Sequence, residues 1–437
     1  MTNIFRCAAA VTHRSHVWSS LRTRIFPGSV AALALAFTLP AAAADSPTER
    51  TAAEIGEEPA ESYQPKGIEF GSFLMLPLLD VSQHYNDNVF ASATDRRSDW
   101  ITRIAPEVKF RSRFANHQLN LKARAEQSFY REYSNDDHFD LNLAADGRYD
   151  IDRNWKLTGI LDASQTHEDR GSPDDAGGKE QTRVRTGTSK LGTETTFGRF
   201  GFKMEGEAIR RDYRDVEGAN GAIVNQDDRD RDELRVTSEL SYELFPGYSA
   251  VVEGSLNDRQ YDDRLDDQQF NRSSHGSTLH AGIGVDISEL VRGDFLIGYM
   301  NQKYDDARFK TIDGISMKAS FNWTPSRMTV IIPTLERSIQ ETTTTNASGM
   351  LRTGGSLTVR HELQRNIILT AIGSAYSEKY RGTTRDNWSY DARLRGQWFL
   401  SPNYYVGGEV GYRERTSKVD SETFDQTIVL FRIGTQL

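Results

Sequence analysis

The chain has 437 residues, of which 37% are hydrophobic, and its mean hydropathy is −0.60. This polar average excludes a bundle of membrane-spanning helices, because only one apolar run, near the N-terminus, exceeds ten residues. The formal net charge of −9 argues against nucleic acid as a partner, since proteins that bind nucleic acid show a basic face. A membrane β-barrel is compatible with the composition, because half of each strand faces water.

The first 44 residues have the pattern of a secretory signal peptide. Four arginines precede the apolar run 30–39, which is followed by Pro40 and a series of alanines. We expect cleavage after Ala44, which removes four arginines and no acidic residue and takes the charge from −9 to about −13. Cys7, the only cysteine, is lost with this segment, so the mature chain has no disulfide and no thiolate metal ligand.

Residues 45–66 follow as an acidic segment with three prolines and few apolar residues. A segment of this composition cannot bury enough apolar surface to fold. We expect it to be a disordered periplasmic leader, with residues 67–437 forming a barrel.

From residue 67 onward, apolar and polar residues alternate in one segment after another. In the segment 388–398, Trp388, Tyr390 and Leu394 fall on one face, and Arg393 and Arg395 fall on the other. Successive side chains of a strand point to opposite faces, so such a segment has one apolar and one charged face. A membrane barrel turns the apolar face toward lipid and keeps its lumen polar, whereas a soluble sandwich buries that face.

Short and long connections alternate between these segments. The short connections centre on residues 114–116, 153–155, 198–200, 246–247, 291–293, 325–327, 364–366 and 402–403. The long polar connections include residues 166–180, 216–232, 262–276, 342–349 and 416–424. Tight periplasmic turns and long extracellular loops are typical of barrels in the bacterial outer membrane.

The connections also give a strand count. Eight short turns join nine hairpins, which predicts an all-β, antiparallel, up-and-down transmembrane β-barrel of about 18 strands with both termini in the periplasm. The strands at 182–197, 328–339 and 366–377 alternate less regularly, and Pro106 and Pro333 lie inside two predicted strands. A barrel of 16 strands is therefore the alternative.

Aromatic residues close to turns and loops on the apolar face support a bilayer environment. Membrane barrels carry such aromatic girdles at both interfaces. The predicted girdle comprises Trp100, Trp155, Trp323, Trp388, Trp398 and Tyr404. The chain ends in an alternating strand, 429–437, which resembles the signal read by the outer-membrane insertion machinery. We therefore expect lipid, lipopolysaccharide and that machinery as partners, in a Gram-negative bacterium.

No constellation of catalytic residues is evident. The histidines of the mature chain are scattered, and no nucleophile elbow or zinc-protease motif occurs, so we expect no enzyme and no cofactor. Asp228, Asp230 and Asp232 occupy positions 1, 3 and 5 of a calcium-loop pattern, but Glu233 stands where that loop needs glycine. This weak metal candidate is better interpreted as a solvated extracellular loop.

Charged residues on the polar face are the candidates for pore lining. They are Arg103, Lys122, Arg124, Glu126, Arg235, Arg393, Arg395, Glu409 and Arg413. One interpretation is a self-neutralised wall held together by cross-strand ion pairs. The other is a charge ladder that guides solutes, in which Arg393, Arg395 and Arg413 form a track for a polyanion. A barrel of 16–18 strands leaves an aqueous channel in either case.

One set of motifs carries a family resemblance. The strand 70–80 runs into the sequence Tyr-Asn-Asp-Asn-Val-Phe at 85–90, and Tyr-Asp-Asp recurs at 261–263 and 304–306. Residues 130–137 repeat the Tyr and Asp pattern. These motifs resemble the putative β-barrel porin 2 family over most of residues 67–437. The resemblance implies a wide conduit for a secreted exopolysaccharide that works with a separate periplasmic export protein.

Three functions remain open at this point. Polysaccharide export is favoured, a general diffusion porin for small hydrophilic solutes is the alternative, and a structural or adhesive surface barrel is the third. Lumen aromatics would favour sugar passage, and Tyr130 and Tyr405 are the clearest candidates. A long loop folded into the lumen would favour a diffusion porin, and 216–232 is the candidate segment.

Overall fold

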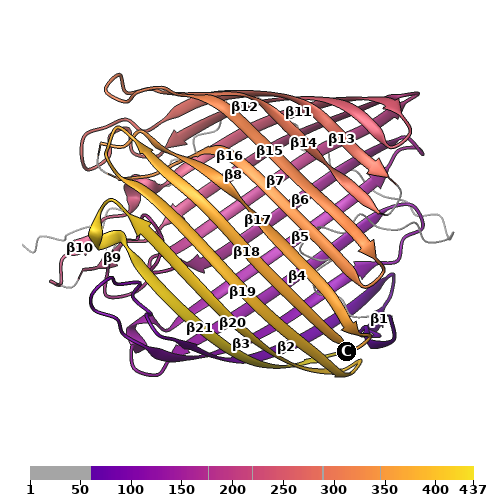
Figure 1. Ribbon diagram of the computed structural model, residues 1–437, viewed down its shortest axis with the longest axis horizontal. Helices are drawn as coiled ribbons and strands as arrows, with labels where there is room; N and C mark the ends of the chain where they lie inside the picture. Colours follow the sequence, from indigo (N-terminus) through magenta and orange to yellow (C-terminus); the bar gives the residue numbers. More distant parts are fainter. Residues whose placement is uncertain (1–60, 176, 219, 288–289, 345) are drawn as a thin grey trace, which may run out of the picture. The chain divides into compact units, whose positions relative to one another are not determined.

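The computed structural model describes residues 61–175, 177–218, 220–287, 290–344 and 346–437 (Figure 1). The predicted signal peptide and the leader up to residue 60 lie outside the described residues. The described chain begins with a short helix, η1 (Glu61–Tyr63), and with β1 (Ile68–Phe70), which pairs with the strand that follows it. None of the helices described is long and apolar enough to cross a membrane.

In the described part of the chain, eighteen antiparallel strands form a closed barrel. Each strand pairs with the next, and the last pairs with the first, so the sheet has no free edge between them. The strands are β2 (Phe73–Asn86), β3 (Asp99–Ser112), β4 (Gln118–Tyr130), β5 (His138–Asp150), β6 (Trp155–His167), β7 (Arg183–Phe197), β8 (Phe200–Tyr213), β11 (Arg231–Phe245), β12 (Tyr248–Tyr261), β13 (Ser274–Ile287), β14 (Val291–Tyr304), β15 (Ile312–Ser326), β16 (Thr329–Gln340), β17 (Gly349–Gln364), β18 (Ile367–Arg381), β19 (Asp386–Ser401), β20 (Tyr404–Ser417) and β21 (Phe424–Gln436). The predicted fold and the count of 18 are confirmed, and the alternative of 16 is excluded.

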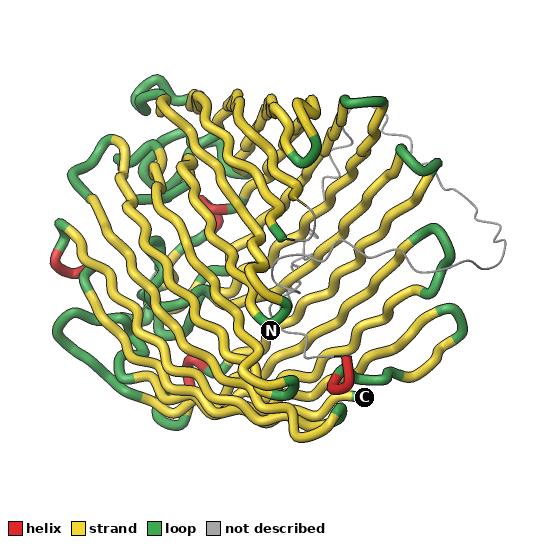
Figure 2. The backbone as a smooth tube through the Cα atoms, turned by 45° about the vertical axis from the view of Figure 1, so that its right-hand side comes forward, coloured by secondary structure: helices red, strands yellow, loops and turns green. Residues whose placement is uncertain are grey.

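The two ends of the barrel differ in their connections (Figures 1 and 2). The end we call the long-loop end, at the left of Figure 1, carries residues 87–98, 131–137, 168–182, 214–230, 262–273, 305–311, 341–348, 382–385 and 418–423. The opposite end, which we call the short-turn end, carries the tight turns and the C-terminus. The alternation of long and short connections expected from the sequence is therefore present, except that the connection 382–385 at the long-loop end is shorter than the connection 113–117 at the other end.

Two predicted turns are misplaced. The turn expected at 291–293 is instead the start of β14, because the β-branched Val291 opens a strand and the turn lies before it. The turn expected at 325–327 begins later, because β15 continues through Pro325 to Ser326. The β15–β16 register shifts between Trp323 and Ser326, which accommodates a residue without a backbone donor.

The two prolines that made the count uncertain lie inside strands. Pro106 is in β3 and pairs with Leu79 of β2, but the ladder between β3 and β4 has no pair at 106. Pro333 is in β16 and pairs with Leu357 of β17, while the ladder to β15 has no pair at 333. Each proline thus interrupts the ladder on one side, since it has no N–H to donate.

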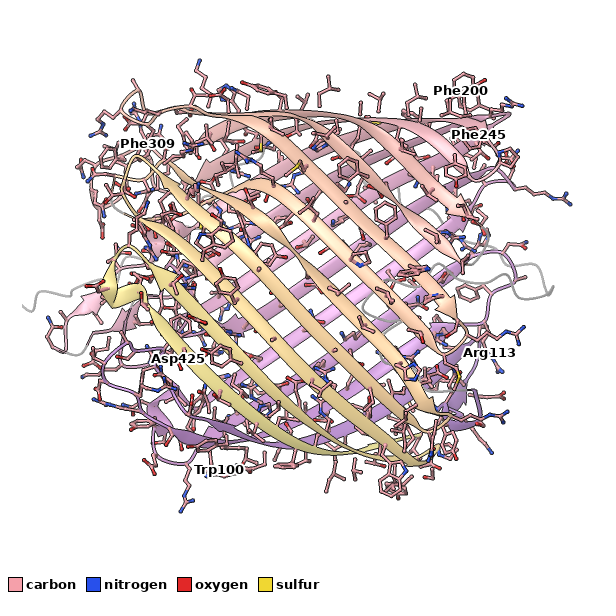
Figure 3. The ribbon with its side chains drawn as sticks, in the orientation of Figure 1. Trp100, Arg113, Phe200, Phe245, Phe309 and Asp425 are labelled. Carbon is pink, nitrogen blue, oxygen red and sulfur yellow. The ribbon has the colours of Figure 1, made fainter. Side chains whose placement is uncertain are left out.

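Apolar side chains point outward and polar side chains point inward along the strands. In β13, Leu279 is 62% exposed on the outside, whereas its neighbour His280 is 7% exposed. In Figure 3, the labelled aromatics Trp100, Phe200 and Phe245 lie along the outer margin of the barrel. An outer surface of this kind is stable only against lipid, because a soluble monomer exposes no apolar belt of this extent.

Candidate pore and its constriction

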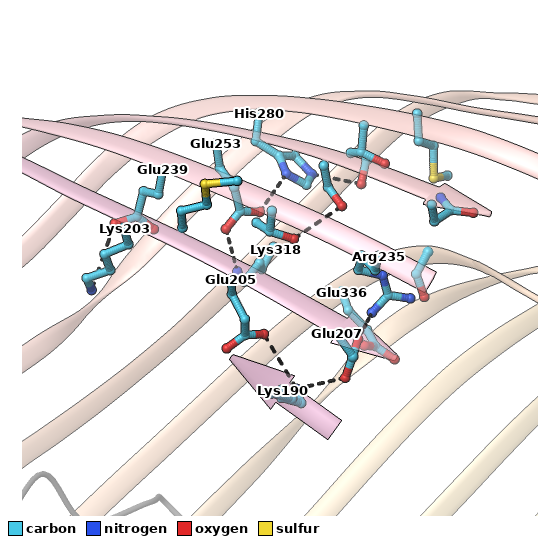
Figure 4. Close-up of a pocket in the computed structure, with 18 of the residues that line it drawn as sticks. Lys190, Lys203, Glu205, Glu207, Arg235, Glu239, Glu253, His280, Lys318 and Glu336 are labelled. Carbon is cyan, nitrogen blue, oxygen red and sulfur yellow. Dashed lines mark hydrogen bonds and ion pairs between the residues drawn. The ribbon is translucent and has the colours of Figure 1, made fainter. Parts of the chain in front are cut away.

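Charged side chains of the lumen wall pair with one another, both between neighbouring strands and between strands that are farther apart. Lys190 Nζ lies 2.8 Å from Glu207 Oε1, and Arg235 Nη1 lies 3.0 Å from Glu207 Oε2. Lys318 Nζ of β15 lies 2.9 Å from Glu253 Oε2 of β12. These groups line a cavity of about 570 Å³ (Figure 4). The wall is therefore charged and wet, and its charges largely neutralise one another.

The nine pore-lining residues predicted from the sequence all alternate with outward apolar residues of their strands. Arg103 Nη1 lies 3.6 Å from Glu126 Oε1, and Arg124 Nη2 lies 2.9 Å from Glu126 Oε2. Lys122 Nζ lies 3.9 Å from Glu107 Oε2. Such pairing is what we expect if the charged residues form a self-neutralised wall rather than a charge ladder that guides solutes.

The arginine strip is paired in the same way. Arg393 Nε lies 2.8 Å from Asp391 Oδ1, and Arg413 Nε lies 3.6 Å from Asp391 Oδ2. Arg395 Nε lies 2.7 Å from Glu409 Oε2. Because each guanidinium has a carboxylate partner, this strip does not form an uncompensated positive track.

The loop 168–182, which we call the crossing loop, extends from the β6–β7 hairpin to distant strands of the wall. Asp169 Oδ2 lies 3.1 Å from Arg413 Nη1 of β20. Arg415, also on β20, donates a hydrogen bond of 2.5 Å to the carbonyl of Gly171. The first part of the crossing loop is therefore fixed to β20.

The next part of the crossing loop reaches two other loops of the long-loop end. Arg385 donates a hydrogen bond of 2.8 Å to the carbonyl of Pro173, and Thr342 Oγ1 donates one of 2.8 Å to Asp174 Oδ1. Six strands separate the β6–β7 hairpin from the β16–β17 hairpin on one side of the barrel, and eight on the other. Contact with Thr342, in the loop 341–348, therefore means that the crossing loop reaches the far side of the long-loop end.

Buried ion pairs hold the base of the crossing loop. Arg170 Nη2 lies 2.5 Å from Asp136 Oδ1, and the two side chains are only 3% and 1% exposed. Arg170 also donates a hydrogen bond of 2.8 Å to the carbonyl of Gly178. Arg229 pairs with Glu168 at 2.7 Å. A carboxylate buried this deeply needs its partner, so these pairs position the loop strongly.

The crossing loop borders two cavities. One, of about 900 Å³, is lined by residues of the loop and of strands β8, β11, β12 and β16 to β21. The other, of about 330 Å³, is lined by residues of the loop and of strands β2 to β6 and β19 to β21. Asp391, Arg393 and Arg413 line both cavities. Nine arginines and eight carboxylates among the described residues line the larger cavity, so its net charge is close to zero.

Burial changes the proton affinity of carboxylates in the loops. Burial raises the pKa of Asp175, in the crossing loop, to about 6 against the opposing effect of Arg170. Burial, reinforced by Asp267, also raises the pKa of Asp228 to about 6. At neutral pH both groups are ionised but close to taking up a proton.

The weak calcium candidate does not assemble as a cluster. Asp230 Oδ1 accepts a hydrogen bond of 2.6 Å from the backbone N–H of Tyr213, and Asp232 lies 3.6 Å from Arg210. Among the described residues, the group with metal-ligand spacing is His138, Asp140 and His167 instead. Sequence reasoning missed this group because its histidines lie 29 positions apart; the pairing of the β5 and β6 strands brings them together.

The expected lumen loop and the expected sugar-stacking rings also differ from the structure. The segment 214–230 forms a small hairpin of its own, β9 (Val216–Glu217) with β10 (Ile223–Val224), whereas the crossing loop spans the lumen. Tyr130 and Tyr405 are 8% and 4% exposed, and Tyr405 donates a hydrogen bond of 2.8 Å to Asp80. Neither ring is open for stacking on a sugar.

The predicted girdle aromatics all lie on the outside and are exposed by 39% to 57%. They are Trp100 and Trp388 toward the long-loop end, and Trp155, Trp323, Trp398 and Tyr404 toward the short-turn end. Two rows of amphipathic rings are what a bilayer with two interfaces requires.

Comparison with solved structures found similar chains at low sequence identity. The siderophore receptor PirA from Acinetobacter baumannii aligns with a TM-score of 0.43 and 7% identity over 83% of this chain and 80% of that chain. The outer membrane protein opdK from Pseudomonas aeruginosa aligns with a TM-score of 0.42 and 12% identity over 83% of this chain and 99% of that chain. No curated protein matches the chain.

Comparison with family models identifies the family to which the chain belongs. The model described as Putative beta-barrel porin 2 matches residues 61–437. The description is that of a β-barrel porin, which points to the bacterial outer membrane. Because the match covers most of its length, the chain belongs to the putative β-barrel porin 2 family.

Proposed function

We propose that this porin is a diffusion channel for small hydrophilic solutes, constricted by the crossing loop. The long-loop end faces the cell exterior and both termini face the periplasm, after removal of the signal peptide. The observation that carries the proposal is the span of the crossing loop from the β6–β7 hairpin to Thr342 and Arg413. A wall of eighteen strands alone would leave a wide channel, and the loop reduces it.

The lining supports passage with little selection by charge. The larger cavity beside the crossing loop has nine arginines against eight carboxylates, and the predicted arginine strip is paired with Asp391 and Glu409. A self-neutralised wall offers hydrogen bonds to polar solutes without a deep well for either sign of ion. We therefore expect neutral sugars and amino acids to pass.

Export of an exopolysaccharide is the second candidate, supported by the motif resemblance. A polymer would have to displace the crossing loop from Arg413, Arg415 and Arg385, and a periplasmic export protein could supply that displacement. The buried pair of Arg170 with Asp136 opposes such a movement. No observation in the described residues favours a structural or adhesive barrel.

Liposome swelling separates the two candidates. Proteoliposomes of the purified barrel should swell in small neutral sugars at rates that fall steeply from monosaccharides to tetrasaccharides, as a constricted channel requires. Liposomes without protein are the control. A second arm deletes the gene: surface polysaccharide should persist while uptake of small hydrophilic antibiotics slows. Loss of the polysaccharide with normal uptake would replace the diffusion channel by the exporter.

A further inference from the structure

Two histidines and a carboxylate meet beside the smaller cavity of the lumen. His138 opens β5, Asp140 follows it by two residues, and His167 closes β6. Each offers a ligand atom, and these atoms lie within 4.8 Å of one another. The side chains are 10%, 27% and 13% exposed, so they are sheltered but reachable from the cavity of about 330 Å³ that all three line.

From this arrangement we propose that His138, Asp140 and His167 bind a divalent transition-metal ion, with Zn²⁺ as the best match. His138 Nε2 lies 3.9 Å from Asp140 Oδ2, and His167 Nδ1 lies 2.8 Å from Asp140 Oδ1. Ligand atoms of a tetrahedral zinc site lie about 3.4 Å apart, so small side-chain rotations bring these three atoms, which lie within 4.8 Å of one another, to the spacing of a zinc site. Imidazole nitrogen with carboxylate oxygen is a donor set for zinc and its neighbours rather than for Mg²⁺.

The outer hydrogen bonds orient His138 for this role. Its Nδ1 lies 2.7 Å from the carbonyl of Asp136, which can only accept, so Nδ1 carries the proton and Nε2 presents its lone pair. Metal-bound histidines are characteristically held in this way. Asp136 is itself fixed by its buried pair with Arg170 of the crossing loop.

Binding at His167 changes the tautomer of its ring. In the metal-free site its Nδ1 donates to Asp140, so when the ion takes that position the ring proton moves through solvent to Nε2 and the histidine stays neutral. Arg103 lies on the same cavity and would repel a cation, but Glu126 lies 3.6 Å from it and offsets its charge. Three protein ligands leave at least one position for water.

The position of the site links it to the constriction. His167 is the last residue before the crossing loop. His138 is hydrogen-bonded to the carbonyl of Asp136, whose carboxylate pairs with Arg170 of the crossing loop. A bound ion therefore ties together β5, β6 and the base of the loop. Metal binding itself does not depend on the proposed channel function, because it is measured on the isolated barrel.

Zinc competition against a chromophoric chelator tests the site, using the untagged barrel in detergent. We expect one Zn²⁺ per chain, undiminished by equal Mg²⁺, and a loss of affinity of about tenfold or more in His138→Gln and in His167→Gln. His275→Gln is the matched control and should bind as the wild type does. His275 is 58% exposed and lies 3.9 Å from Asp305, outside any three-ligand group in the described chain.

X-ray absorption of the zinc-loaded wild type keeps the test decisive if a variant fails to fold, which heat-modifiable gel mobility reveals. Two imidazole ligands at about 2.0 Å are expected. Absence of stoichiometric binding, a zinc shell without imidazole, or equal loss in His275→Gln would each overturn the proposal.

Discussion

Two long loops of the same barrel satisfy their backbone groups in opposite ways. The segment 214–230 pairs with itself through β9 and β10, and Ile223 of β10 is 67% exposed. The described residues of the crossing loop, 168–175 and 177–182, form no helix or strand, and the carbonyls of Gly171 and Pro173 are satisfied instead by arginines of β20 and of the β18–β19 loop. A buried loop needs partners for its polar backbone groups, and here the lumen wall provides them.

The comparison shows what makes a loop enter a pore. Length and polarity do not distinguish the two segments, and both contain glycine and aspartate. The crossing loop differs in having Arg170 and Asp169 where Asp136 and Arg413 can pair with them. Charge complementarity with the loop 131–137 and with β20, rather than any local pattern, directs its path.

Removal of each loop tip should show the largest difference. Replacing residues 171–175 with two glycines joins the cavities of about 900 and 330 Å³, so we expect single-channel conductance to rise by roughly twofold, because conduction follows pore width. Deleting residues 220–222 of the β9–β10 hairpin should leave the conductance unchanged. Equal effects in planar bilayers would show that the crossing loop does not constrict the channel.

Loss of the buried ion pair between Arg170 and Asp136 should have the second-largest effect. Arg170→Ala leaves Asp136, which is 1% exposed, without its partner, so the folded position of the crossing loop loses about 3–5 kcal/mol. We expect unstable, elevated conductance and faster backbone hydrogen exchange in the loop. Lys179→Ala is the control, because its pair with Glu217 is exposed and contributes about 0–1 kcal/mol. An unchanged Arg170→Ala channel would place the anchoring elsewhere.

The pH dependence should be smaller and should have a defined sign. The pKa of Asp175 rises from 3.8 to about 6 on folding of the loop, so the folded loop disfavours its ionised form. The resulting penalty is absent below about pH 4, grows between pH 4 and 6, and is complete above pH 6. We therefore expect fewer current fluctuations at pH 5 than at pH 7.5. The Asp175→Asn channel should show equally few current fluctuations at both pH values. If the variant keeps the wild-type difference between pH 5 and pH 7.5, a group other than Asp175 causes that difference.

The smallest effect concerns the far contact of the crossing loop. Asp174→Asn keeps an oxygen that accepts the hydrogen bond from Thr342, so current fluctuations should match the wild type. Asp174→Ala removes the acceptor and should weaken the loop by about 1 kcal/mol. A ranking of the two variants in the reverse order would mean that the charge of Asp174, and not its hydrogen bond, matters.

The alternation of residues by itself determined the barrel. The faces of Leu394 and Arg395, the outward girdle and the eighteen strands were all readable, because side-chain direction in a strand is a local property with a period of two. Turn positions were less certain, as at Val291 and Pro325, because a strand continues as long as its neighbour offers hydrogen bonds.

Tertiary structure decided what fills the lumen. The crossing loop depends on contacts with residues 168 to 244 positions away, such as Thr342 and Arg415, and no local pattern encodes such a distance. His138 and His167 meet only because of the register of the β5–β6 hairpin. Local periodicity thus fixes the wall, whereas the pairing of charges that lie far apart in the sequence fixes the path of the crossing loop.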